Sequence, residues 1–258
     1  MNIPEIKPIQ VKQFETKQSR YDHVPRTPFR NALYAPSGSG KTVLLQNMIL
    51  DIYRNVFDFV VIISPTVFVD ATWRPCLKYI TEELEQDNEK DPWVFDHFDA
   101  EALDKIIDTQ FKVAELAKKG KGKRIPSIWL ILDDVADQPE LTRQSRSLWK
   151  VYTKGRHAAI SCTISVQKVV TVAPIIRVNL SHIIIFRLRS QQDLETFLNE
   201  TSALIDKKTV LQLYRLATDP AYGFLYVDLT QPTVDRMFYS NFSKRLIPRH
   251  RFRASGIP

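Results

Sequence analysis

The sequence NALYAPSGSGKTVLLQNMIL, residues 31–50, decides the fold because a glycine-containing loop lies between two segments of different periodicity. Residues 29–35 form a largely apolar run that predicts a β-strand, and residues 40–54 carry apolar side chains at helical spacing. The loop at residues 35–42, APSGSGKT, matches the phosphate-binding pattern G-x-x-x-x-G-K-[ST], with alanine in place of the first glycine. This order of strand, loop and helix predicts a site for nucleotide phosphates.

The loop residues have separate expected roles. We expect the backbone N–H groups from Ser37 to Lys41, with the start of the following helix, to surround the anion. Lys41 would reach the β- and γ-phosphates, and the Thr42 hydroxyl would bind Mg²⁺. The predicted nucleotide-binding residues are Ala35, Pro36, Ser37, Gly38, Ser39, Gly40, Lys41 and Thr42. The alternative is a flexible Ser/Gly turn with a chance lysine.

Two carboxylates follow a second apolar run. In SIWLILDD, residues 127–134, five apolar residues precede Asp133 and Asp134. A phosphate loop needs a carboxylate at a neighbouring strand end to hold the metal, and we assign that role to Asp133. We expect Asp134 to polarise the attacking water. The alternative is a solvated turn in which Asp134 or Asp137 caps the next helix.

Strands and helices alternate along the chain, which predicts an α/β fold with a mostly parallel central sheet flanked by helices. Continuous β-branched runs are typical of strands buried on both faces. The expected strands cover 29–35, 57–65, 93–98, 127–134, 158–167, 182–188 and 221–229, and the main later helices cover about 100–117, 139–153, 190–199 and 206–217. We expect an extended N-terminal arm at 1–28, a P-loop ATPase domain at 29–235 and a basic C-terminal tail at 236–258.

Composition narrows the class of protein. The formal net charge of +7 favours a polyanionic partner. No stretch approaches the roughly 20 apolar residues that cross a bilayer, so we expect no transmembrane segment. The N-terminal MNIPEIKPIQ lacks an apolar signal core, which argues against secretion. We interpret Cys76 and Cys162 as reduced core thiols.

Residues 154–190, KGRHAAISCTISVQKVVTVAPIIRVNLSHIIIFRLRS, resemble the stretch that follows the acidic strand in FtsK/HerA-type DNA translocases. The shared features are an arginine at a helix end (Arg156), a strand that finishes in Gln167 and an Arg-x-Asn segment at 177–179. The small size and the Asp-Asp pair most resemble the poxvirus-like genome-packaging ATPases of large DNA viruses. The resemblance covers about residues 29–190 and implies a RecA/ASCE-like P-loop NTPase fold.

The resemblance also implies roles for individual side chains. Gln167 would be the polar sensor that contacts the γ-phosphate or the attacking water. Arg156 or Arg177 would reach an adjacent subunit's nucleotide and stabilise charge in the transition state. Arg143 and Arg146 are weaker alternatives. The competing interpretations are a surface amide for Gln167 and a surface or DNA-backbone contact for each arginine.

The function implied is an ATP-hydrolysing double-stranded DNA translocase that packages a viral genome into the capsid. Its cofactors would be ATP and Mg²⁺, and it would act as a homo-oligomeric ring on DNA without reading sequence. A capsid or internal-membrane protein at a packaging vertex is a further expected partner, with localisation in the host cytoplasm, a viral factory or the virion. Ala35 and Asp134 replace the glycine and glutamate more usual in bacterial translocases, which weakens the bacterial-pump interpretation more than the viral one.

Three basic segments are candidates for DNA contact: the arm, the loop at 118–124, and the tail at 236–258, which has no acidic residue. The alternative for each segment is a solvated surface. Other functions also stay open: a nucleotide-gated DNA-binding assembly protein, an FtsK/HerA-type DNA pump or helicase not involved in packaging, and a P-loop kinase or small-molecule ATPase. The absence of an N-K-x-D motif weighs against a GTPase.

Overall fold

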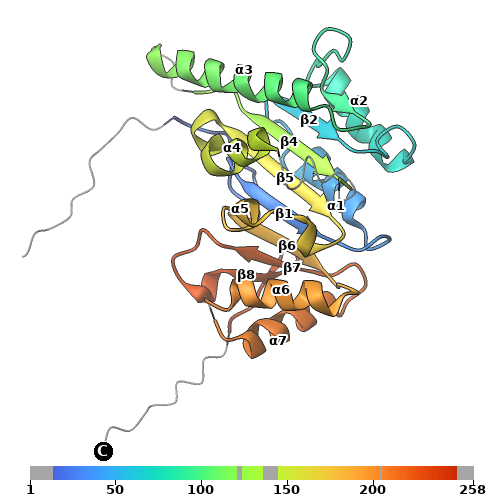
Figure 1. Ribbon diagram of the computed structural model, residues 1–258, viewed down its shortest axis with the longest axis vertical. Coiled ribbons are helices and arrows are strands. Elements are labelled where there is room, and N and C mark those ends of the chain that lie inside the picture. The colour runs from blue at the N-terminus through green and yellow to red at the C-terminus, as the bar shows by residue number, and fades with distance from the viewer. Residues whose placement is uncertain (1–13, 121–123, 136–144, 204, 249–258) are drawn as a thin grey trace, which may run out of the picture.

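The computed structural model describes residues 14–120, 124–135, 145–203 and 205–248. Strands in these residues form one sheet in the order β3-β2-β4-β5-β1-β6-β7-β8-β9. The strands are β1 (Arg30–Tyr34), β2 (Phe59–Ile63), β3 (Val94–Phe95), β4 (Ile128–Asp133), β5 (Ile160–Val166), β6 (His182–Phe186), β7 (Phe224–Asp228), β8 (Phe238–Ser240) and β9 (Lys244–Arg245). Figure 1 shows the strands stacked along the long axis, with β2 near one end and β7 and β8 near the other.

Helices connect and cover these strands. The α-helices are α1 (Lys41–Asn47), α2 (Arg74–Glu82), α3 (Ala100–Lys119), α4 (Arg146–Lys154), α5 (Pro174–Arg177), α6 (Gln191–Thr201) and α7 (Lys207–Thr218). A π-helical turn, η1 (Met48–Ile52), continues α1, and short 3₁₀ turns occur at η2 (Ala71–Trp73), η4 (Gly155–Ala158), η5 (Val169–Thr171) and η6 (Val234–Arg236). The helix expected at 139–153 is described only from Arg146 onward, because 136–144 lie outside the described residues.

The strand directions place the loops that follow β1, β4 and β5 at one edge of the sheet. β1 pairs in parallel with β5 and β6, and β4 pairs in parallel with β5 and β2. The carboxyl ends of β1, β4 and β5 therefore meet at the same edge, where open α/β sheets bind ligands. This arrangement is the mostly parallel α/β sheet of a P-loop NTPase, as the sequence predicts.

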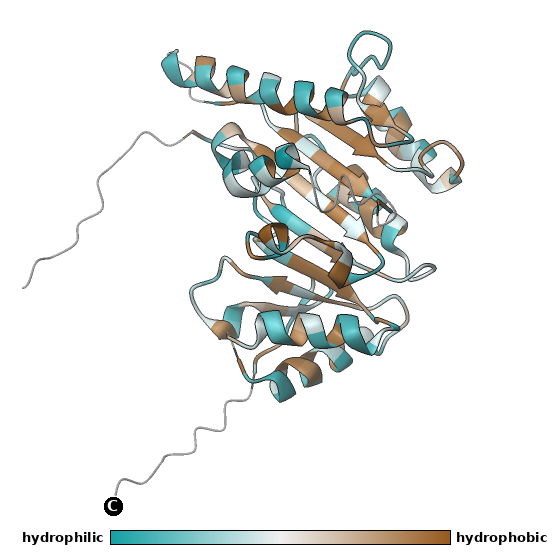
Figure 2. Ribbon diagram, in the orientation of Figure 1, coloured by the Kyte–Doolittle hydropathy of each residue, from teal (hydrophilic) through white to brown (hydrophobic). Residues whose placement is uncertain are grey.

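The central strands are buried on both faces, as their continuous apolar runs predict. Every residue of β5, β6 and β7 is buried, and Figure 2 shows the central strands mostly brown against mixed teal and brown helices. Trp129 of β4 packs in an aromatic cluster with Phe29, Tyr53 and Phe57, with ring centroids 5.2–5.6 Å from the indole. Its Nε1 donates a hydrogen bond to Thr163 Oγ1 at 3.0 Å, so the buried polar atom is satisfied.

The sheet continues past the boundary expected at residue 235. β7, β8 and β9 run antiparallel to their neighbours, and Leu246 after them is buried. Residues 236–248, expected to belong to a tail, therefore include two strands of the sheet. Strands of two or three residues are too short to show a periodicity, which is why the sequence did not reveal them.

Candidate nucleotide site

The phosphate loop leaves β1 at the carboxyl edge and enters α1. The backbone N–H of Ala35 donates to the Val166 carbonyl at 3.0 Å, which continues the strand pairing. An alanine suffices at this extended position. Gly38 and Gly40 have φ angles of 76° and 92°, a left-handed backbone that favours glycine. Ser39 Oγ donates to the Pro36 carbonyl at 2.6 Å and closes the turn between them.

Asp133 ends β4 and is almost completely buried. Burial raises the pKa of its carboxyl, and the Lys41 charge partly offsets that increase. Ser64 Oγ, after β2, donates to Asp133 Oδ2 at 3.5 Å, whereas Oδ1 has no hydrogen-bond partner among the described residues. An unpartnered buried carboxylate oxygen is costly, and a hard cation such as Mg²⁺ would satisfy it.

Asp134 turns its carboxylate toward the phosphate loop. Its φ of 55° is left-handed, a conformation that aspartate tolerates better than most residues, and its N–H donates to the Ser165 carbonyl. Oδ1 lies 2.8 Å from Lys41 Nζ and accepts a hydrogen bond from Gln167 Nε2 at 3.0 Å. Burial raises the pKa of this carboxyl, but the contacts with Lys41 and Gln167 outweigh it, and the net pKa is below its usual value.

Three strand ends thus bring together the lysine after β1, the carboxylates at the end of β4 and the glutamine after β5. These are Lys41, Asp133, Asp134 and Gln167. Thr42, the next residue after Lys41, is part of the first turn of α1 and is partly exposed. The set combines a cation, a buried carboxylate with an unpartnered oxygen and a second carboxylate with an amide beside it, which are groups of the kind that can bind a phosphate, a metal and a water molecule.

The structure places the candidate arginines outside this cluster. Arg156 is exposed in η4, which precedes β5, while Gln167 follows that strand. At about 3.3 Å per residue, the seven residues of β5 separate these positions by roughly 23 Å. Arg156 therefore lies at the end of β5 away from the phosphate loop of its own chain.

Arg177 is engaged inside the protein. Its Nε lies 2.5 Å from Glu200 Oε1, and its Nη1 donates to the Val172 carbonyl at 2.5 Å. These contacts join α5 to α6 and leave little of the guanidinium exposed. Arg146 is exposed at the start of α4, and Arg143 lies outside the described residues.

Two site residues were missed in the sequence analysis. Ser64 follows β2, and Arg189 follows β6 and donates from Nη2 to the Ser37 carbonyl of the phosphate loop at 3.1 Å. Both are polar residues just after an apolar strand, the same signal that revealed Asp133.

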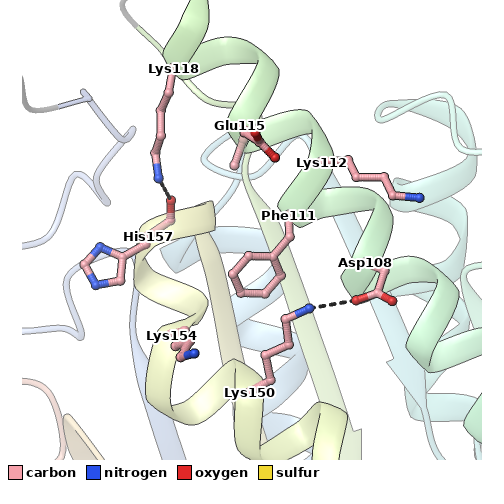
Figure 3. A pocket seen from close by; sticks show the side chains of 9 residues that line it. Asp108, Phe111, Lys112, Glu115, Lys118, Lys150, Lys154 and His157 are labelled. Carbon is pink, nitrogen blue, oxygen red and sulfur yellow. Dashed lines mark hydrogen bonds and ion pairs between the residues drawn. The ribbon is translucent and has the colours of Figure 1, made fainter.

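A basic groove of about 540 Å³ lies between α3 and α4, near the amino end of β5 (Figure 3). Four lysines line it with two carboxylates: Lys112, Lys118, Lys150 and Lys154, and Asp108 and Glu115. Lys150 Nζ lies 2.7 Å from Asp108 Oδ1 and 4.3 Å from the centre of the Phe111 ring. Lys154 makes no ion pair with a carboxylate in the described ranges, so the groove keeps a positive excess.

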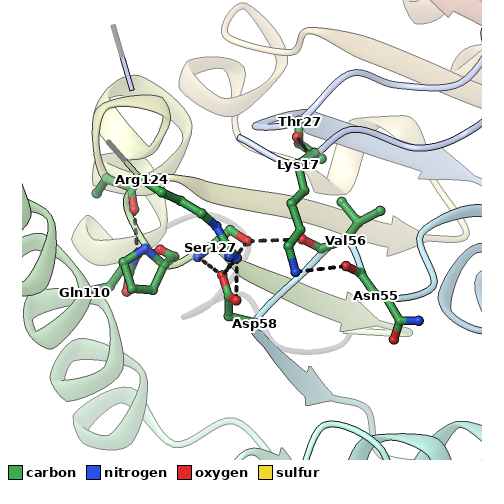
Figure 4. Close-up of polar contacts among 10 residues, drawn as sticks. Lys17, Thr27, Asn55, Val56, Asp58, Gln110, Arg124 and Ser127 are labelled. Carbon is green, nitrogen blue, oxygen red and sulfur yellow. Dashed lines mark hydrogen bonds and ion pairs between the residues drawn. The ribbon is translucent and has the colours of Figure 1, made fainter. Parts of the chain in front are cut away.

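Several described cations of the arm and of the 118–124 loop already make hydrogen bonds or ion pairs within the protein. Lys17 Nζ donates to the Asn55 carbonyl at 3.2 Å, and Arg124 forms an ion pair with Asp58 (Figure 4). Arg20 pairs with the Asp51 carboxylate. Residues 1–13, 121–123 and 249–258, which hold further basic residues of the arm, the loop and the end of the tail, lie outside the described residues.

Comparisons with known proteins agree with this fold. The family described as poxvirus A32 protein matches residues 16–227. A curated relative, the uncharacterized protein 075L of Invertebrate iridescent virus 6, is 25% identical over 138 residues, which cover 53% of this chain and 50% of that protein. The match thus spans about half of the relative's length.

Solved structures share the fold. The genome packaging NTPase B204 of Sulfolobus turreted icosahedral virus 2, in complex with sulfate, matches with a TM-score of 0.55 and 16% identity over 84% of this chain and 96% of that chain. EssC (ATPases 2 and 3) from Geobacillus thermodenitrificans matches with a TM-score of 0.53 and 12% identity over 95% of this chain and 48% of that one. Within the described residues, no helix is long and apolar enough to span a membrane.

Proposed function

The chain belongs to the poxvirus A32 protein family, and from this membership and the site geometry we propose that it is a viral genome-packaging ATPase. In this proposal, ATP hydrolysis with Mg²⁺ drives translocation of double-stranded DNA into the capsid. The B204 structures support the assignment, because they are described as a genome packaging NTPase and include a complex with the ATP analogue AMPPCP.

The observation that carries the proposal is the cluster around Asp134. One carboxylate oxygen lies within 2.8 Å of Lys41 Nζ and 3.0 Å of Gln167 Nε2. A carboxylate so placed, with its pKa held low by Lys41 and Gln167, is ionised at neutral pH and can orient a water molecule; it becomes a stronger base when Lys41 turns to the phosphates. An ion pair between Lys41 and Asp134 with only a structural role would not need to lie at the end of a phosphate loop, nor would it need the Gln167 amide beside it.

The residues divide the chemistry between them. Backbone N–H groups of the loop and Lys41 would hold the phosphates, and Asp133 and the Thr42 hydroxyl would hold the metal. Mg²⁺ held there would supply positive charge that offsets the charge of the phosphates. Asp134 would orient and deprotonate the attacking water, while Gln167 fixes the carboxylate and senses the γ-phosphate.

We assign the DNA backbone to the basic groove between α3 and α4. Translocation requires contacts to phosphates that carry no sequence information, and lysines provide them. The groove presents Lys112 and Lys154 beside the pair of Lys150 with Asp108. Burial, with the neighbouring Arg156 and Lys118 charges, lowers the pKa of His157, so this residue is neutral at pH 7 and adds no charge.

A homo-oligomeric ring completes the proposal. Arg156 is exposed at the sheet edge opposite the phosphate loop, so in a ring it is available to a neighbour's nucleotide. Because the Arg177 guanidinium is already paired with Glu200, Arg156 is the better candidate for that role. A capsid or internal-membrane protein at a packaging vertex is the proposed docking partner, in the host cytoplasm, a viral factory or the virion.

The test is an ATPase assay with and without duplex DNA, combined with a mass measurement of the assembled species. We expect DNA to stimulate hydrolysis and the K41A variant to lose it. The Asp91→Asn variant, which changes an exposed carboxylate elsewhere, is the control and should keep wild-type turnover. Hydrolysis that survives K41A, or that never responds to DNA, would contradict the proposal.

A further inference from the structure

Tyr222 is an exposed aromatic residue beside the phosphate loop. Its side chain is 72% exposed, although tyrosine usually buries much of its ring. Its Cδ1 would lie only 3.2 Å from a Cβ atom placed on Gly40, so the ring rests against the last glycine of the loop. Tyr222 lies within the strand expected at 221–229, but β7 begins at Phe224.

The turn before β7 holds this ring in place. Tyr222 has a left-handed φ of 59°, and the N–H of Gly223 donates to the Pro220 carbonyl at 2.9 Å. A Cβ at Gly223 would lie 2.4 Å from the Ala217 carbonyl oxygen, so only glycine allows this tight turn. A strained turn that keeps a large apolar ring in solvent has a cost, which points to a use for the ring.

A second exposed apolar side chain lies on the same side. Val43 is 51% exposed and follows Gly40 by three residues, a spacing that places both on one face of the helix start. Arg189, after β6, contacts the loop at Ser37. Since β6 and β7 continue the sheet from β1 on the side away from β4, these residues flank the loop opposite Asp133.

We propose that Tyr222, with Val43, forms the platform on which the nucleobase of the bound nucleotide stacks. The inference rests on the proposed nucleotide site and adds the base to it. If Asp133 and Asp134 hold the metal and the attacking water on the β4 side, the rest of the nucleotide would extend from the loop toward β6 and β7. An aromatic face stacks on a planar base, which accounts for an exposed ring at this place.

The experiment compares two ligands, ADP and inorganic tripolyphosphate, which lacks a base. Equilibrium binding is measured for the wild type and for Y222A, Y222F, L216A and K41A. We expect Y222A to weaken ADP binding by roughly tenfold, as aromatic stacking on a base predicts, and to leave tripolyphosphate binding unchanged. Y222F keeps the ring and should match the wild type. L216A removes another exposed apolar side chain, which is 59% exposed, and should change neither ligand.

The outcomes separate this inference from the proposed function. If Y222A keeps wild-type affinity for ADP while K41A loses both ligands, the nucleotide site stands and the role of Tyr222 is wrong. If Y222A weakens both ligands equally, the ring supports the loop rather than the base, which also overturns the inference. If K41A still binds both ligands as the wild type does, the proposed function itself fails.

Discussion

Lys41 Nζ and Asp134 Oδ1 lie 2.8 Å apart, so the cation expected to hold phosphate and the carboxylate expected to activate water contact each other directly. The charge of each side chain partly neutralises the charge of the other. Because both side chains are largely shielded from solvent, water weakens this attraction only a little. A phosphate that binds Lys41 must compete with Asp134 for it. Binding of the nucleotide would thereby free the carboxylate for catalysis at the moment when it is needed.

The Asp134→Asn variant separates these two roles. We expect hydrolysis to fall by about 100-fold or more, because a general base contributes that much, while nucleotide affinity stays equal or rises a few-fold as Lys41 loses its competitor. Single-turnover hydrolysis and equilibrium ATP binding measure the two effects, with D91N as the control. Near-wild-type hydrolysis by D134N would remove Asp134 from the mechanism.

The Asp133→Asn variant tests the metal site. Asparagine has the same shape, so the buried position remains filled, but it lacks the charge that holds Mg²⁺. We expect ATP to raise the Tm of the wild type more with Mg²⁺ than with a chelator, and this Mg²⁺-dependent increment to disappear in D133N. An increment equal to that of the wild type would show that Asp133 does not hold the metal.

The double variant Lys112→Ala/Lys154→Ala tests the basic groove. If both lysines contact DNA phosphates, duplex affinity should fall and the slope of log affinity against log salt should decrease by about 2. The matched control is Lys207→Ala/Lys208→Ala, which removes the same charge from the exposed start of α7. Equal losses in the two double variants would point to a general charge effect and not to the groove.

The buried pair of His182 and Asp228 predicts a pH-dependent stability. Burial lowers the pKa of His182 below its usual 6.5, although Asp228, whose Oδ1 lies 3.3 Å from His182 Nε2, opposes this shift. The unfolded chain therefore binds this proton at a higher pH than the folded chain does. The free energy of unfolding should fall as the pH drops below about 6.5, with a slope approaching 1.4 kcal/mol per pH unit.

Denaturant unfolding at pH 7.5, 6.5 and 5.5 measures this slope. The H182Q variant cannot bind the proton and should give a flatter profile, whereas H97Q, which removes an exposed imidazole, should keep the wild-type slope. If H182Q and the wild type lose stability in parallel, another group is responsible for the pH dependence.

Much of the site was predictable because it follows from strand direction. Parallel strands deliver their carboxyl ends to one edge, so a glycine loop after β1, carboxylates after β4 and Gln167 after β5 had to approach one another. The left-handed backbone of Asp134, which turns this side chain toward Lys41, depends on pairing with Ser165 on a neighbouring strand. No local pattern encodes that contact.

Other features lay beyond the sequence pattern for physical reasons. The apolar neighbours of Tyr222 predict a strand that includes it, and only the three-dimensional structure shows that β7 begins at Phe224. The antiparallel direction of β7 is set by its pairing with β6, a contact between segments about 40 residues apart that no local pattern encodes. The α3–α4 groove combines lysines from segments about 40 residues apart, so no single run of charge revealed it.

The seven residues of β5 connect the proposed nucleotide site with the proposed DNA-binding groove between α3 and α4. This strand is hydrogen-bonded on both sides, to β4 and β1, and carries Gln167 at one end and the turn with His157 at the other. We expect a strand that is hydrogen-bonded on both sides to resist stretching and to move as a unit. A small advance of the amide toward a γ-phosphate would be delivered, about 23 Å away, as a shift of the lysine-lined floor on which a duplex would rest.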